Sequence, residues 1–127
     1  MRNFIVSLFS LLVILCLWGS FSLYSEKVTG DLQAQSQTLI NTSISSEDWD
    51  SAETDYRQLS ETWHKYKRTA SFFLDAKDIN EIDSTMDKAY LYMKAKDVSN
   101  STGEFSYLKE KFRFMYQNDT LSLHNIF

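Results

Sequence analysis

The most hydrophobic part of the chain is its N-terminal segment. From Phe4 to Leu23 the sequence contains no charged residue, and a polar, regularly patterned sequence follows it. Roughly twenty residues of α-helix, rising about 1.5 Å each, cover the roughly 30 Å hydrocarbon core of a bilayer. We therefore predict an N-terminal transmembrane anchor over residues 1–24.

The charges at the two ends of this segment predict its orientation. Arg2 and the free amino group precede it, whereas only Lys27, beside Glu26, follows it closely. Because positive charge is retained in the cytoplasm, the N-terminus should be cytoplasmic and the rest extracytoplasmic, in a single-pass plasma-membrane protein. A cleavable signal peptide is the competing interpretation, since Ser20 and Ser22 are the small residues that a signal peptidase requires. We favour the uncleaved anchor.

Beyond the anchor, apolar residues recur at alternating spacings of three and four. This heptad pattern is typical of helices packed against one another and cannot arise from strands. The longest repeat comprises Trp49, Ala52, Tyr56, Leu59, Trp63, Tyr66, Ala70 and Phe73. Two shorter repeats comprise Ile79, Ile82, Met86, Ala89 and Met93, then Phe105, Leu108, Phe112 and Met115.

The repeats predict an all-α fold. Helices are expected over about residues 25–41, 47–74, 78–97 and 103–117, the first of them continuing the membrane span. Short connections make neighbouring helices antiparallel. We therefore predict an extracytoplasmic domain over residues 25–127, built as an antiparallel bundle of three to four helices with the C-terminal tail folded back against it.

Short polar residues predict where these helices begin. Ser45 or Ser46 should cap the longest helix, and Asp78 the next. Ser101 lies three residues before Glu104, which is the spacing of a capping box.

Composition and charge exclude some classes of function for this protein. The chain of 127 residues has no proline and three glycines, which suits long helices. After Ser25 it carries 12 Lys and Arg against 17 Asp and Glu, a net charge of −5. Phosphate binding requires a basic face, so a nucleic-acid partner is excluded. The single cysteine, Cys16, follows Leu15 instead of the small residue that lipoprotein processing needs.

No motif predicts an active site. Glu61 and His64 form half of the signature of metal-binding bundles, but the heptad places both on the solvent side and no second copy exists. Four acidic residues lack the glycine and the spacing of a calcium loop and suit a helix N-terminus. They are Asp48, Asp50, Glu53 and Asp55. We assign no catalytic, cofactor-binding or metal-binding residue and predict that the protein is not an enzyme.

Aromatic residues on the longest helix are the candidate interaction site. Trp49, Tyr56, Trp63 and Tyr66 share one face, where packed helices usually carry Leu or Ile. Such rings form either a wide bundle core with buried hydroxyls or a surface for a partner. The core interpretation is favoured, because a bundle this small needs all its apolar area.

Two short segments carry a family resemblance. Residues 77–83 (KDINEID) open a predicted helix, and residues 122–127 (SLHNIF) end the chain. With the N-terminal span and the tryptophan-marked helix, they resemble domain-of-unknown-function family 4363, a family of short single-pass bacterial membrane proteins. The resemblance implies a Gram-positive-type membrane protein with an extracytoplasmic helical domain and brings no activity.

These observations favour a non-enzymatic accessory or interaction protein. Its expected partners are the lipid bilayer and another membrane or envelope protein. The alternative is a sensor or small-ligand-binding bundle, in which the aromatic rings line a pocket between helices.

Overall fold

The computed structural model describes the backbone of residues 1–126 and the side chains as far as Met115. The helices are α1 (Arg2–Thr38), α2 (Trp49–Ala70), α3 (Ala76–Lys94) and α4 (Val98–Ile126), and a π-helical segment, η1 (Leu39–Ile44), continues α1. Residues 1–126 contain no strand. The predicted all-α class is therefore confirmed.

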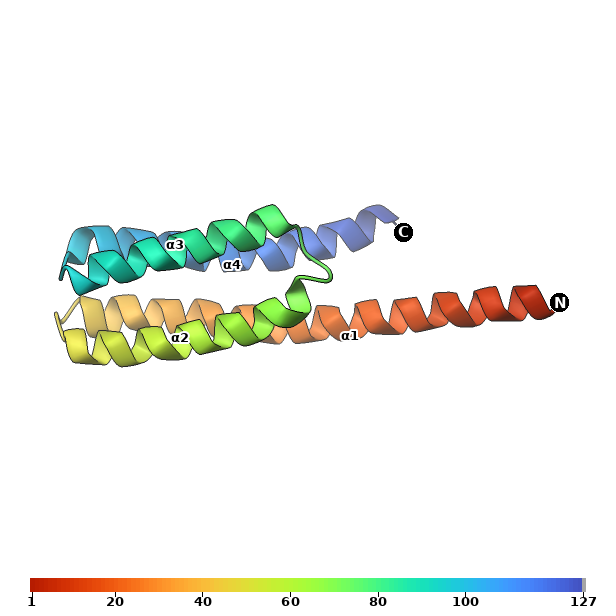
Figure 1. The fold of residues 1–127 in the computed structure, drawn as a ribbon, viewed down its shortest axis with the longest axis horizontal. Coiled ribbons are helices and arrows are strands. Elements are labelled where there is room, and N and C mark those ends of the chain that lie inside the picture. The colour runs from red at the N-terminus through yellow and green to blue at the C-terminus, as the bar shows by residue number, and fades with distance from the viewer. Residues whose placement is uncertain (127) are drawn as a thin grey trace.

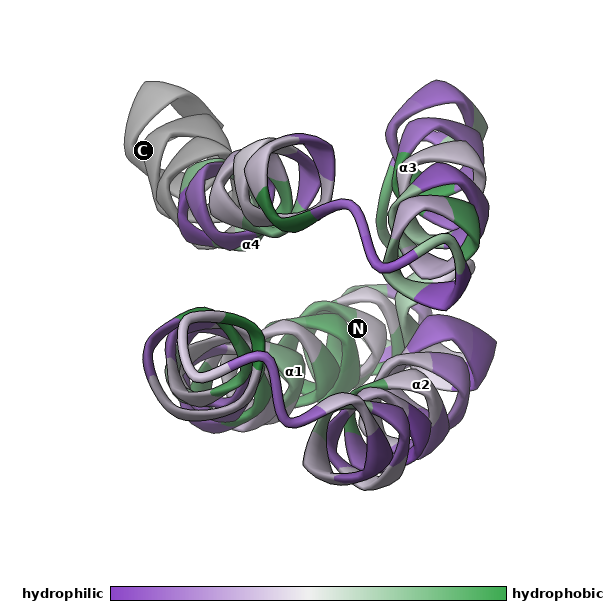
Figure 2. Cartoon of the chain, turned by 90° about the vertical axis from the view of Figure 1, so that its left-hand side faces the viewer, coloured by the Kyte–Doolittle hydropathy of each residue, from purple (hydrophilic) through white to green (hydrophobic). Residues whose placement is uncertain are grey.

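The four helices lie side by side, and each runs opposite to the one before it (Figure 1). Seen from one end, they occupy the corners of a square, with α1 beside α2 and α4, and α3 beside α4 (Figure 2). The N-terminal half of α1 extends beyond the other helices (Figure 1). The structure is therefore a four-helix bundle from which the N-terminal half of α1 projects.

The candidate span and the first bundle helix are one continuous helix, α1. Residues 1–17 are exposed along their whole length, and packing against the bundle begins at Trp18. Gly30 does not interrupt the helix, since a single glycine costs only about 1 kcal/mol relative to alanine. Within the described residues, this is the one helix long and apolar enough to cross a membrane.

The core contains the residues that the heptad pattern predicts. Every repeat position on α3 and α4 is buried, as are Ala52, Leu59, Trp63, Tyr66 and Ala70 on α2. Trp49, Tyr56 and Phe73 are partly buried and pack against this core. The heptad prediction of the core is confirmed on these three helices.

On α1 the buried face is partly polar. Ser25, Thr29 and Ser36 are as buried as Leu32 and Leu39. The Thr29 hydroxyl donates to the Ser25 carbonyl at 2.6 Å, and the Ser36 hydroxyl to the Leu32 carbonyl at 2.8 Å. Because these hydroxyls bond within their own helix, small polar residues can face the core without an unpaired polar group.

The predicted cap of the longest helix was wrong. Asp48, not Ser45 or Ser46, caps α2 and accepts from the Ser51 amide at 3.2 Å. Residues 39–44 remain helical, and Glu47 then adopts a positive φ of 56°. A left-handed residue ends the preceding helix, so α2 can begin only after it.

The other two predicted caps were also wrong, because an aspartate three or four residues earlier takes the role. Asp75 accepts from the Lys77 amide at 3.0 Å, which makes Asp78 a first-turn residue of α3. Asp97 accepts from the Asn100 amide at 3.1 Å. Ser101 is consequently a buried interior residue, whose hydroxyl donates to the Asp97 carbonyl.

The last helix is longer at both ends than its predicted range of 103–117. The cap at Asp97 starts α4 at Val98, and the helical backbone continues to Ile126. The predicted folding back of the tail concerns side chains that lie outside the described residues. No proline or glycine occurs after Gly103 to end the helix earlier.

Candidate interaction site

The four aromatic residues predicted as a core or interaction stripe are placed at different depths. Trp63 and Tyr66 are completely buried, whereas Tyr56 and Trp49 are partly buried. The stripe thus begins at the surface near the start of α2 and enters the core toward its end. Its Trp49 end borders a surface hollow.

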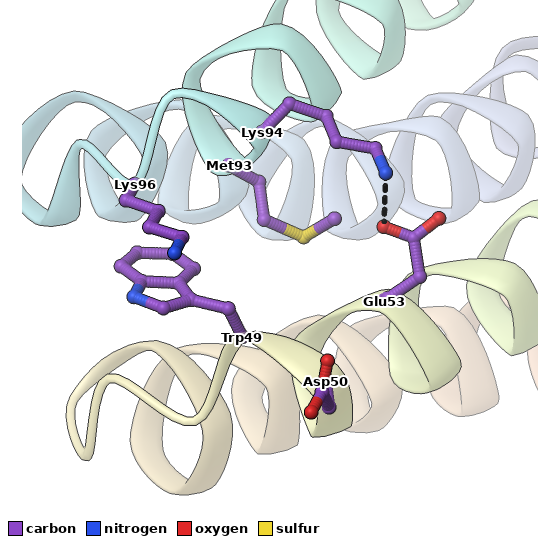
Figure 3. Close-up of a pocket in the computed structure, with 6 residues that line it drawn as sticks. All are labelled: Trp49, Asp50, Glu53, Met93, Lys94 and Lys96. Atoms are coloured by element: carbon purple, nitrogen blue, oxygen red, sulfur yellow. Dashed lines mark ion pairs between the residues drawn. The ribbon is translucent and has the colours of Figure 1, made fainter.

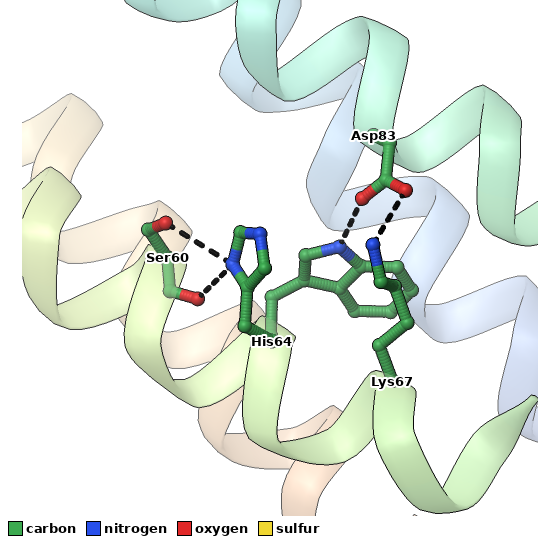
Figure 4. A network of polar contacts seen from close by, with 5 residues as sticks. Ser60, His64, Lys67 and Asp83 are labelled. Carbon is green, nitrogen blue, oxygen red and sulfur yellow. Dashed lines mark hydrogen bonds and ion pairs between the residues drawn. The ribbon is translucent and has the colours of Figure 1, made fainter.

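Trp63 makes both a ring contact and a hydrogen bond with neighbouring helices. Its ring centroid lies 5.8 Å from that of Phe112 on α4. Its Nε1 donates to Asp83 Oδ1 on α3 at 2.8 Å, while Lys67 donates to Oδ2 at 2.9 Å (Figure 4). One carboxylate therefore joins two positions on α2 to α3.

Tyr66 makes the corresponding link to α1. Its hydroxyl oxygen lies 2.5 Å from Ser25 Oγ, and both residues are buried. Its ring is nearly parallel to that of Phe21, with centroids 6.2 Å apart. A tyrosine at this heptad position therefore pairs its hydroxyl with the small polar face of α1.

Tyr56 belongs to a second polar group, between α2 and α3. Its hydroxyl donates to the Met86 carbonyl at 3.3 Å, and burial, aided by the Asp87 carboxylate, raises the pKa of Tyr56 to about 12. The neighbouring Tyr90 donates to Glu53 at 3.1 Å. The tyrosine hydroxyls of the stripe are therefore bonded within the bundle.

Trp49 borders an open hollow of about 420 Å³ between the start of α2 and the end of α3 (Figure 3). The other lining residues are Asp50, Glu53, Met93, Lys94 and Lys96. The ion pair of Lys94 with Glu53, at 3.1 Å, crosses it. The hollow therefore combines one indole with charges of both signs.

The residues that the sequence suggested as metal ligands are exposed or bonded to other groups. Glu61 and His64 are exposed, as predicted, and His64 Nδ1 lies 2.7 Å from the Ser60 carbonyl oxygen (Figure 4). Of the acidic residues near the start of α2, Asp48 caps the helix and Asp55 accepts from Ser43 at 2.5 Å. Among the described residues, no three His, Cys, Asp or Glu side chains are grouped to hold a metal ion.

Sequence reasoning missed an aromatic cluster beside the apolar half of α1. Phe73 follows α2, and its ring stacks on Phe21 with centroids 4.1 Å apart and lies 6.0 Å from Trp18. The adjacent Phe72 is 85% exposed. The sequence signal was present in the Phe-Phe pair at the end of the repeat, but only the antiparallel packing brings it beside Phe21, near the end of the uncharged run of α1.

The ion pair of Glu81 on α3 gives a pH-dependent contribution to stability. Glu81 accepts from the Tyr107 hydroxyl and from Lys111 at 3.0 Å, both on α4. These hydrogen bonds, that of Tyr107 first, hold the pKa of Glu81 below its ordinary value of 4.5. The stabilisation is therefore complete above that value and is lost as the pH falls through the lowered pKa.

We expect the thermal unfolding midpoint of the full chain to fall less between about pH 5 and pH 3 in Glu81→Gln than in the wild type. The amide cannot titrate, so that variant loses the contribution of Glu81 but keeps those of Glu53 and Asp97, whose pKa values are also lowered by their hydrogen bonds. Circular dichroism in detergent measures the midpoints. Parallel pH profiles for the two proteins would contradict the contribution of Glu81.

Among the comparisons with known proteins, one family model matches the chain. The family model described as a domain of unknown function, DUF4363, matches residues 20–126. No curated protein and no solved structure matches the chain.

Proposed function

The chain belongs to the DUF4363 family, and from that premise we propose that it is a membrane-anchored, non-enzymatic accessory protein. In this proposal α1 crosses the plasma membrane once with its N-terminus in the cytoplasm. The helical bundle then lies on the extracytoplasmic side, where it contacts another membrane or envelope protein.

The continuity of α1 is the observation that supports this proposal most. Residues 4–17 are exposed and mostly apolar, while Leu32 of the same helix is a core residue of the bundle. A flexible linker would let an anchored domain move freely. A helix shared by the span and the bundle instead holds the bundle at a fixed height and orientation above the membrane.

The carboxylates between the helices bind other side chains of the bundle, which supports a structural role. The carboxylates of Asp83, Glu53 and Glu81 bind lysine, tyrosine or tryptophan donors on a neighbouring helix. Each of these contacts joins α2 to α3 or α3 to α4. These acids therefore have partners that fix the helices relative to one another.

The end of the bundle remote from the span is the surface best suited to a protein partner. Trp49 lies there with the Lys96 side chain against its ring, across the hollow from the ion pair of Lys94 with Glu53 (Figure 3). Tryptophan contributes disproportionately to protein interfaces, because it buries a large area and retains a hydrogen-bond donor. The ligand-binding alternative has less support, since this hollow is open and lined largely by charged side chains.

Site-specific photocrosslinking in native membranes tests the partner. A benzoylphenylalanine at position 49 is expected to form one discrete adduct with another membrane or envelope protein. The same group at Leu91, which is 67% exposed on α3, is the matched control. A chain that stays monomeric and free of adducts at position 49 would contradict the proposed interaction.

Cysteine labelling on intact cells tests the topology. In a Cys16→Ala background, Lys96→Cys is expected to react with a membrane-impermeant maleimide, whereas Asn3→Cys reacts only after lysis. The reverse labelling would overturn the orientation. A mature chain lacking residues 1–22 would show instead that the segment is a cleaved signal peptide.

A further inference from the structure

The connection between α2 and α3 lies at the end of the bundle from which the apolar half of α1 projects (Figure 1). It comprises residues 71–75 and contains Phe72, Phe73 and Leu74. The other two connections lie at the opposite end of the bundle (Figure 1). Of the three connections between the described helices, this one is apolar, and it faces the predicted membrane.

Contacts with α1 fix the height of this connection along the span. The Phe73 ring stacks on Phe21 at 4.1 Å and meets Trp18 edge-on at 6.0 Å. Both partners precede Leu23, the last residue of the uncharged run, and at about 1.5 Å per residue they lie roughly 3 to 8 Å inside its end. If that run fills the hydrocarbon core, the connection is level with the outer bilayer interface.

Phe72 points away from the bundle at this height. Its side chain is 85% exposed, whereas Phe73 is packed against the core. An exposed phenylalanine gains nothing from water, but it is favourable at the boundary of a bilayer, where aromatic rings accumulate. Its exposure is therefore consistent with insertion into lipid.

Most backbone amides of the connection already have hydrogen-bond partners. The amides of residues 71–74 all donate to carbonyls of the last turn of α2, at 2.8 to 3.2 Å. A backbone amide without a partner would make insertion costly. Here the amides next to Phe72 are already bonded.

Charged residues flank the aromatic residues on both sides. Arg68 in the last turn of α2 and Lys77 in the first turn of α3 are exposed and can reach lipid phosphates. The acid between them, Asp75, caps α3 through the Lys77 amide. The order of cation, aromatic pair and cation suits a segment lying in the headgroup layer.

We propose that the α2–α3 connection is a second membrane contact, in which Phe72 inserts into the outer interface of the bilayer that α1 crosses. This inference rests on the proposed anchoring of α1. A helix and a separate loop held in the same bilayer would prevent the bundle from tilting away from the membrane surface. The remote Trp49 end would then be presented outward.

Fluorescence quenching of the full chain in vesicles tests this contact. Single cysteines replace Phe72, Leu91 or Ile14 in a Cys16→Ala background and carry a nitrobenzoxadiazole label, in vesicles of phosphatidylcholine and phosphatidylglycerol. Leu91 is the control for an exposed apolar residue away from the membrane, and Ile14 is the control for the span. Aqueous iodide and lipid-attached nitroxide are the two quenchers.

The expected result is several-fold weaker iodide quenching at position 72 than at position 91, with strong quenching by a shallow lipid nitroxide. Equal iodide quenching at positions 72 and 91, with position 14 protected, would overturn the second contact and leave the anchor intact. Iodide access at position 14 as well would overturn the anchor and the inference together.

A second set of variants removes the hydrophobicity of the label as an explanation. The label is moved to Ser71→Cys, and position 72 is Phe, Leu or Asp. Protection of the label is expected with Phe and Leu and lost with Asp, because a carboxylate opposes insertion. Since Phe72 is exposed, its replacement should leave the fold unchanged by circular dichroism. Equal protection in all three proteins would overturn the role of Phe72.

Discussion

Trp63→Ala is expected to lower the free energy of unfolding by about 3 to 5 kcal/mol, the usual cost of truncating a fully buried tryptophan. Trp63 is completely buried and lies between Tyr66 and Phe112. The substitution leaves a cavity in the core, next to Phe112 of α4, and removes one donor from Asp83. Guanidinium unfolding of the full chain in detergent, followed by circular dichroism, measures the loss.

The conservative variant separates packing from hydrogen bonding. Trp63→Phe keeps most of the apolar volume and removes only the Nε1 donor, so about 1 kcal/mol is expected. Asp83 retains Lys67 and is partly exposed to water. A Trp63→Ala loss below about 1 kcal/mol would show that the ring does not belong to the core.

Glu26→Pro is expected to remove about 3 kcal/mol or more of stability, because proline lacks the amide hydrogen and clashes with the preceding turn of a helix. Glu26 is exposed within α1, between the buried Ser25 and Thr29. A break there would separate the span from the bundle and disturb the contact of Ser25 with Tyr66. The same unfolding experiment, together with the helical ellipticity, measures the effect.

Glu26→Ala is the matched control and should change the stability by no more than about 0.5 kcal/mol, since the side chain is exposed and alanine favours helix. If Glu26→Pro were as stable as Glu26→Ala, α1 would not be continuous at this point. The rigid connection that supports the proposed function would then be lost.

Periodicity predicted most of the core because a helix buries only one stripe of its surface. On α3, the residues from Ile79 to Met93 that recur at three and four are all buried, and so are those from Phe105 to Met115 on α4. Solvent-facing assignments followed from the same geometry, as at Glu61 and His64. Which positions of a helix are buried and which face solvent depends on the spacing of residues along the chain, and that spacing can be read directly from the sequence.

Helix starts were less predictable, because several polar residues could cap each helix. Asp97 and Ser101 both lie near the start of α4, and both side chains can accept from a backbone amide. Which of the two residues caps the helix depends on where the preceding connection ends. Lys96, with a positive φ of 58°, ends that connection immediately before Asp97.

The aromatic stripe illustrates what spacing cannot supply about a site. Trp49 and Trp63 occupy equivalent repeat positions, yet one borders a surface hollow and the other is buried. Their environments differ because α1 and α3 pack along the middle of α2, where Trp63 also reaches Phe112 of α4, while the first turn of α2 lies at the end of the bundle. Position along the bundle axis, not the heptad position, decides the exposure.

The sequence by itself determined an apolar N-terminal segment, helices of heptad pattern and an acidic remainder, because hydropathy and periodicity are properties of neighbouring residues. Only the tertiary structure decided that the continuation of the candidate span is the fourth helix of the bundle, that Tyr66 pairs with Ser25, and that Phe73 packs on Phe21. The members of each pair are more than forty residues apart, so they meet only when the helices fold back on one another.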